Sequence, residues 1–218
     1  MQSAFGTIAS DACRLLRVVV CDSLSLVRIL TIIPIMKKIF IFITILTALT
    51  LINAAAQQTS QAAAELTFQF TRLSGSASNQ FAVWIEDSQG RYVKTLYATR
   101  YTANGGWRRR ETSIPVWVRQ SGLVDLSRSQ IDALTGATPR TGVLSYTWDG
   151  TNSLGAAVSP GEYVIFLEGT LRWENQVLYR APIRLGQGAS MPQVSAEYSG
   201  DAGADRLMIG NVTVRTLR

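Results

Sequence analysis

Histidine is absent from this chain of 218 residues, and cysteine occurs only twice, at Cys13 and Cys21. Without histidine, imidazole general acid–base catalysis, Ser-His-Asp triads and most zinc sites are excluded. Both cysteines precede the segment that we expect to remain after export, so a disulfide framework or a Cys-x-x-Cys redox pair is excluded there. Acidic residues are scattered and form no paired-carboxylate motif. We therefore predict no catalytic residue, no metal site, and at most an electron carrier.

Charged residues make up only 17% of the chain, whereas apolar residues make up 47% and aromatic residues 9%. This composition supplies a packed core, and the length corresponds to one domain or at most two. The formal net charge is +6, but five of the 21 basic and two of the 15 acidic residues precede Gln57. The remaining net charge of +3 is too small to indicate binding to nucleic acid.

A long apolar run, 39–52, follows Lys37 and Lys38 and precedes the three alanines 54–56. This order is typical of a secretory signal peptide. The run is shorter than the roughly 20 apolar residues that span a bilayer comfortably. We expect a signal peptide over 36–56, cleavage after it, and contact with the membrane only before cleavage. A retained anchor is the alternative.

Residues 1–35 form neither a fold nor a basic leader, because their apolar stretches are interrupted by Asp22, Arg28 and Pro34. We interpret them as an upstream extension from a start assigned at Met1 instead of Met36. The alternative is a long or twin-spanning leader.

Short strands dominate the rest of the sequence. Leu66, Phe68 and Phe70 alternate with polar residues, as in a strand with one buried face. The run 81–85 is apolar on both faces, and turn residues join it to a second strand over 91–97. Further runs rich in Val, Ile, Tyr and Phe occur at 143–148, 162–167, 176–184 and 207–214. The pattern predicts an all-β fold, an Ig-like antiparallel β-sandwich over 65–218, preceded by a linker over 57–64.

One short inserted helix is expected between the strands. Ser127 and Gln130 have the spacing of a capping box, and a short apolar stripe follows at Ile131, Ala133 and Leu134. Gly136 stands where a left-handed C-terminal cap is expected.

A second motif begins at Trp148. It consists of Trp148-Asp149-Gly150, then Gly155, Val158 and Gly161-Glu162-Tyr163. The Asp-Gly and Pro-Gly pairs favour turns, and the aromatic side chains are expected to pack at the strand ends. The string resembles the signature of the Ig-like domain of flagellar hook-capping proteins, which implies a fold and no particular function.

A wider set of residues resembles a family of predicted periplasmic proteins, domain of unknown function 2271, over 66–214. The matching strings are 81–87 with Gly90, 94–96, Trp117, 132–138 and the Trp-Asp-Gly hairpin. The resemblance implies an exported, periplasmic protein without a settled activity.

Within this set, one string matches the motif Asp-x-x-Ser/Thr-Gly-Ala-Thr, which flavin transferases use to attach FMN through a phosphoester. The matching residues are Asp132, Thr135, Gly136, Ala137 and Thr138. The resemblance implies that Thr138 is the acceptor and that Asp132 is a recognition residue. A hydroxyl must attack a pyrophosphate, and Gly and Ala let a transferase approach the backbone.

Pro139 favours an extended conformation for Thr138, which presents its hydroxyl. The alternative is an ordinary helix C-terminus, with Gly136 at the cap and Asp132 solvated. No separate flavin-binding domain accompanies the motif.

Three adjacent arginines, Arg108, Arg109 and Arg110, follow Trp107. Their guanidinium groups suit a flavin phosphate, a partner's carboxylate or an acidic lipid headgroup. The alternative is a solvated loop. Core and sheet-face packing, not a ligand platform, is expected for Trp84, Trp117, Trp148 and Trp173.

These observations favour a periplasmic accessory protein that carries FMN covalently and relays electrons to or from a membrane redox protein. Its expected partners are that redox protein and a flavin transferase. The rival hypothesis is a non-catalytic binding or structural module of the cell envelope.

Overall fold

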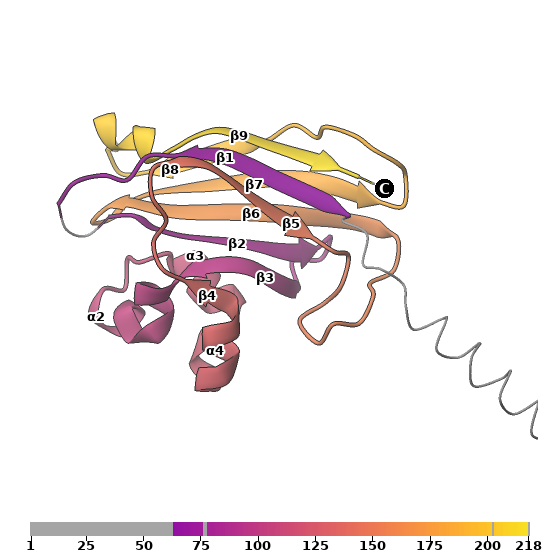
Figure 1. The fold of residues 1–218 in the computed structure, drawn as a ribbon, viewed down its shortest axis with the longest axis horizontal. Helices are drawn as coiled ribbons and strands as arrows, with labels where there is room; N and C mark the ends of the chain where they lie inside the picture. The colour runs from indigo at the N-terminus through magenta and orange to yellow at the C-terminus, as the bar shows by residue number, and fades with distance from the viewer. Residues whose placement is uncertain (1–62, 76–77, 202, 218) are drawn as a thin grey trace, which may run out of the picture. The chain divides into compact units, whose positions relative to one another are not determined.

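A computed structural model describes residues 63–75, 78–201 and 203–217 (Figure 1). The expected signal peptide and the residues upstream of it lie outside this range. The described strands form two sheets. The smaller sheet has the order β5-β1-β9 and consists of β1 (Ala64–Phe70), β5 (Gly142–Trp148) and β9 (Ile209–Thr216).

The larger sheet has the strand order β4-β3-β2-β6-β7-β8. Its members are β2 (Gln80–Asp87), β3 (Tyr92–Thr99), β4 (Thr135–Gly136), β6 (Gly161–Arg172), β7 (Asn175–Leu185) and β8 (Ser195–Ser199). All neighbours in it are antiparallel except β3 and β4, which are parallel.

The main core lies between the two sheets. Along β1 every second residue is buried, which confirms the strand predicted from the alternation of Leu66, Phe68 and Phe70. The rings of Phe68 and Phe81, which belong to opposite sheets, meet edge to face with centroids 5.4 Å apart. Such burial stabilises the fold by roughly 25 cal/mol for each Å² of apolar surface removed from water. The predicted all-β sandwich is confirmed.

A second core covers the outer face of the larger sheet. Ala82 and Trp84 of β2 are buried there against Trp117 and Ile114, and the ring of Trp84 stacks on Phe166 at 5.0 Å. This explains why β2 is apolar on both faces. Trp117 lies on a helix, whereas the sequence had placed it only in a packed core.

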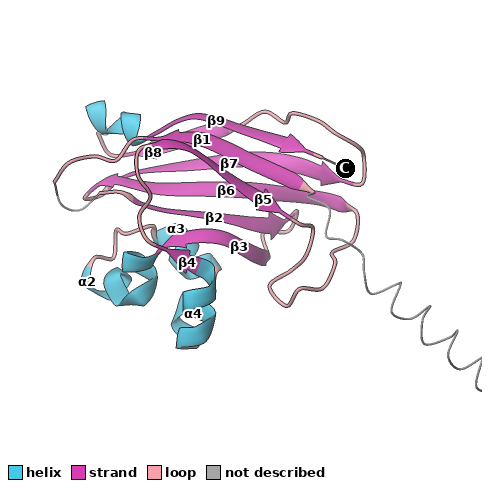
Figure 2. Cartoon of the chain, viewed as in Figure 1, coloured by secondary structure: helices cyan, strands magenta, loops and turns pink. Residues whose placement is uncertain are grey.

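Helical turns between β3 and β5 form this second layer, which is larger than the one short helix expected. They are η1 (Thr102–Gly106), α2 (Trp107–Arg109), α3 (Pro115–Gln120), η2 (Leu123–Asp125) and α4 (Arg128–Leu134). Figure 2 shows α2, α3 and α4 gathered beside β2, β3 and β4. A further turn, η3 (Gly203–Met208), precedes β9. Among the described residues, no helix is long and apolar enough to cross a bilayer.

The predicted start of α4 is confirmed, and its predicted end is wrong. Ser127 and Gln130 form the capping box, with the Ser127 backbone N–H donating to Gln130 Oε1 at 2.9 Å. At the other end Thr135 is extended, and Gly136 forms no left-handed cap. Instead, Thr135 and Gly136 pair with Ala98 and Thr99 of β3. The edge of β3 has backbone groups available for hydrogen bonding, and Thr135 and Gly136 pair with them instead of forming a helix C-terminal cap.

The Trp-Asp-Gly motif forms a buried turn. Trp148 is fully buried, its indole N–H donates to the Thr151 carbonyl at 2.8 Å, and its ring lies 5.1 Å from that of Tyr163. Trp173 behaves differently, because it lies between β6 and β7 and is 55% exposed. The expectation of core or sheet-face packing is therefore wrong for Trp173.

Candidate functional site

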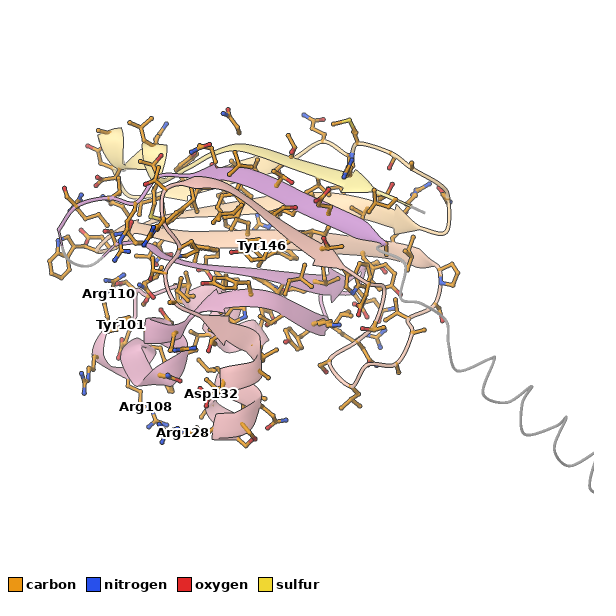
Figure 3. All side chains as sticks on the ribbon, viewed as in Figure 1. Tyr101, Arg108, Arg110, Arg128, Asp132 and Tyr146 are labelled. Carbon is orange, nitrogen blue, oxygen red and sulfur yellow. The ribbon has the colours of Figure 1, made fainter. Side chains whose placement is uncertain are left out.

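The acceptor motif lies where α4 runs into β4, at one edge of the larger sheet. Asp132 is exposed on α4, as Figure 3 shows, and Ala137 is exposed just after β4. Thr135, Gly136 and Thr138 are half-buried. The five motif residues therefore form one continuous strip with a polar residue at each end.

Tyr97 holds the middle of this strip. Its hydroxyl donates a hydrogen bond to the Ala137 carbonyl at 2.7 Å. A Cβ added to Gly136 would come within 2.6 Å of Cε2 of Tyr97. Packing against Tyr97 therefore explains the glycine at position 136 without any contact to a transferase, since only glycine lets the strip lie this close to the Tyr97 ring.

Aromatic rings continue from Tyr97 into the main core. The Tyr97 ring lies 5.2 Å from Phe81 and 5.0 Å from Tyr146. Burial raises the pKa of both Tyr97 and Tyr146, so both phenols stay neutral at physiological pH. The strip is therefore backed by a neutral aromatic surface.

One polar atom of the motif has no protein partner. The hydroxyl of Thr135 is buried, and it neither donates nor accepts a hydrogen bond within the described part of the chain. A buried hydroxyl without a partner costs about 1–3 kcal/mol, so such groups are often found where a ligand or water supplies the missing bond.

The three adjacent arginines differ in their surroundings. Arg108 and Arg109 are exposed on α2, and the Arg108 guanidinium lies 5.0 Å from the ring centroid of Trp107. Arg110 is half-buried, and its Nε and Nη2 atoms are buried without a partner among the described residues. Burial lowers the pKa of Arg110. The solvated-loop interpretation therefore fails for Arg110.

Three hollows open on the helical layer, and two of them include residues of the arginine run; the third, of about 370 Å³, lies among α2, α3 and η2. The first of the two arginine-lined hollows, of about 590 Å³, is lined by η1, α2 and Arg100. The other, of about 390 Å³, lies among η1, α2, η2 and α4 and includes Arg128. Thr138 lines neither of these two, so the structure does not bring the arginines and Thr138 together in one hollow.

Sequence reasoning missed Arg100 and Arg128 as members of this cationic surface. Arg100 follows β3 and Arg128 opens α4, and only the packing of the helical layer brings both near Arg108. No local pattern in the sequence signals that meeting.

A further hollow, of about 620 Å³, lies elsewhere, beside β6 and β7. Its charged residues Arg184 and Glu162 already pair with each other at 2.6 Å. Its charged side chains are therefore paired, whereas the arginines of the two arginine-lined hollows form no ion pair among the described residues.

The described residues form a β-sandwich with a helical layer on one face, and the five motif residues lie in a partly exposed strip. A family model described as "Predicted periplasmic protein (DUF2271)" matches residues 61–203. The match covers more than half of the chain, so the chain belongs to this family, and its location is the periplasm. No curated protein and no solved structure matches it. The resemblance to hook-capping proteins stays a prediction.

Proposed function

We propose that this periplasmic protein carries FMN covalently on Thr138 and relays electrons to or from a membrane redox protein. The observation that carries the proposal is the fixed position of the acceptor strip. Tyr97 holds Gly136 and Ala137 against the edge of β3, so Thr138 follows a rigid segment at the surface. A rigid, accessible segment suits both recognition by a transferase and a constant place for a redox group.

The attachment is a phosphoryl transfer. The Thr138 hydroxyl forms an ester bond to the FMN phosphorus of a flavin dinucleotide, the pyrophosphate bond breaks, and the adenosine monophosphate half leaves. The hydroxyl proton passes to a base of the transferase. Asp132 is exposed on the same strip, so a transferase contacts it without unfolding α4.

The residues around the strip fit a flavin. Tyr97 and Tyr146 provide neutral aromatic surface, and the unpartnered Thr135 hydroxyl provides a hydrogen-bonding group within the motif. FMN, when bound, supplies one- and two-electron transfer, which a segment without cysteine and histidine does not offer by itself.

Co-expression with a flavin transferase tests the attachment, read as flavin fluorescence of the denatured protein on a gel. We expect a fluorescent wild type and a dark Thr138→Ala variant. Thr135→Ser should label like the wild type, because the motif accepts either residue. Asp132→Ala should label more slowly, whereas Asp125→Ala, an exposed aspartate outside the motif, should not. A colourless wild type with a transferase proven active on another substrate overturns the proposal.

A second candidate function is a non-catalytic binding module of the cell envelope. The observation that favours it is the arginine-lined surface of the helical layer, which lies apart from Thr138. This candidate becomes the better one if the wild type is not flavinylated.

A further inference from the structure

The two arginine-lined hollows of the helical layer adjoin each other, because Asn104, Gly105 and Arg108 line both. We call them together the arginine groove. Its four arginines are Arg100, Arg108, Arg109 and Arg128. Figure 3 shows Arg108 and Arg128, from α2 and α4, at the same end of the helical layer.

Positive charge dominates the lining of the groove. No acidic residue lines either of its hollows, and the carboxylates in the neighbouring hollow are those of Glu111 and Asp125, beyond Trp107 and Val124. Within the part of the chain that the structure describes, none of the four arginines forms an ion pair, whereas Arg172, Arg180 and Arg215 each pair with a carboxylate. Several unpaired guanidinium groups around one concavity attract an anion, and their planar donors match the oxygens of a phosphate.

Arg110 adds positive charge close to the groove, because its backbone N–H donates to the carbonyl of Gly106, a lining residue, at 2.9 Å. It lies next to Tyr101, which lines the groove, and its buried Nε and Nη2 atoms have no partner among the described residues (Figure 3). A partly desolvated cation without a counter-charge is costly. An anion bound in the neighbouring hollow offsets part of that cost.

The backbone of η1 leaves room for a ligand. Gly105 has a φ of +92° and nothing within 4 Å of the position of a Cβ. Gly106 has the opposite constraint, since a Cβ there would lie 2.7 Å from the Tyr101 ring. The two glycines thus allow a kink in η1, where Asn104 and Gly105 depart from helical φ/ψ and open space remains beside Gly105.

The groove also has apolar lining residues. Leu123, Leu126 and Ile131 line the hollow that contains Arg128, and Trp107 lies beside Arg108. Each hollow has the volume of a small-molecule site, for which about 300–1,000 Å³ is usual. The groove therefore combines cationic and apolar lining residues.

We infer that the arginine groove binds a phosphate ester whose body is apolar or aromatic. The arginines bind the phosphate, and the apolar lining residues contact the apolar or aromatic part of the ester. Both a soluble phosphate ester and the headgroup region of an acidic phospholipid have this chemistry. The inference does not depend on flavin attachment, because Thr138 lies outside the groove.

Titration with phenyl phosphate tests the inference. Two reference probes are inorganic phosphate, which lacks the aromatic ring, and benzyl alcohol, which lacks the charged phosphate. Because Arg108 lies over the Trp107 ring, we expect a saturable change in tryptophan fluorescence that is absent from Trp107→Phe. Phenyl phosphate should bind more tightly than either reference probe. Co-sedimentation with phosphatidylcholine vesicles, with and without phosphatidylglycerol, tests whether the groove binds the phosphate of an acidic phospholipid.

Variants decide whether the groove is the site. Arg108→Gln and Arg128→Gln should each weaken binding about tenfold or more, since each removes charge-assisted hydrogen bonds. Arg140→Gln, which removes an exposed arginine outside the groove, and Thr138→Ala should bind like the wild type. Thermal melts of all variants should coincide.

Each outcome has a definite meaning. If the protein binds acidic vesicles but not phenyl phosphate, and Arg108→Gln abolishes that binding, the groove is the binding site and the phosphate that it binds belongs to a lipid headgroup. An equal loss in Arg140→Gln would show diffuse attraction to a cationic surface and overturns the inference. So does the absence of saturable binding to both phenyl phosphate and acidic vesicles, or equal affinity for inorganic phosphate and phenyl phosphate.

Discussion

The Glu168 carboxylate on β6 accepts a hydrogen bond from the backbone N–H of Trp117 on α3 at 2.7 Å. It also accepts one from Val116 at 3.0 Å. Glu168 is almost fully buried, and these two N–H groups belong to the first turn of α3, where no helical carbonyl is available to them. A carboxylate in the sheet therefore fastens the helical layer that forms the arginine groove.

The burial of Glu168 makes stability depend on pH. Burial raises the pKa of Glu168 from its ordinary value of 4.5 to about 7, although the two N–H groups and Arg119 oppose the change. The folded protein thus holds a proton that the unfolded chain releases at lower pH. The stabilisation is fully present below about pH 4.5 and is lost as the pH rises through about 7, on the order of 3 kcal/mol.

Urea unfolding between about pH 5 and about pH 8 measures this effect. We expect the free energy of unfolding of the wild type to fall over that range. Glu168→Gln should flatten the slope, and Glu174→Gln, an exposed control, should keep it. Glu86 adds a smaller slope of the same sign, because burial raises its pKa as well. A wild type that becomes more stable toward pH 8 contradicts this assignment.

A second prediction concerns Gly136. Gly136→Ala should destabilise the domain by about 1–3 kcal/mol, because the new methyl group overlaps the Tyr97 ring. In a Tyr97→Ala background the same change should cost less than about 1 kcal/mol. Chemical denaturation of the four proteins gives the coupling. Equal costs in both backgrounds would show that Tyr97 is not the obstacle.

A third prediction compares two tryptophans. Trp148→Ala should cost roughly 3–5 kcal/mol, because the side chain is fully buried and its N–H is hydrogen-bonded. Trp173→Ala should cost less than about 1 kcal/mol, since that side chain is largely exposed. Thermal and urea melts measure both. An unchanged Trp148→Ala melt would be incompatible with the buried turn.

The sandwich was predictable because its strands carry local signals. The alternation in β1 and the two-sided apolar run in β2 each identify a strand and which of its faces is buried. The capping box of α4 is equally local. These features depend on residues within a few positions of each other.

The helical layer and the end of α4 were not predictable in this way. The carboxylate that caps α3 comes from Glu168, which is distant in sequence. Gly136 has the local pattern of a helix cap, but the free edge of β3 and the Tyr97 ring determine its conformation. The motif residues 132–138 are recognisable in the sequence because they form one continuous string, and their role stays a prediction. Arg100 and Arg128 of the groove were not predicted, because only tertiary packing joins them to Arg108.

A fourth prediction concerns processing. We expect the periplasmic form to begin at or near Gln57, because basic, apolar and small residues precede it in the order that signal peptidase requires. N-terminal sequencing of the protein from a periplasmic fraction measures this. An intact Met1 would refute it.

The intact mass of the protein, expressed with and without an active flavin transferase, tests covalent flavin attachment most directly. We expect the co-expressed wild type to gain the mass of one FMN phosphoester, and peptide mapping to place it on Thr138. Thr138→Ala should keep the unmodified mass with a nearly unchanged melting curve, since a half-exposed loop hydroxyl contributes little stability. An unmodified wild type, or a modification that persists in Thr138→Ala, would contradict the proposed function.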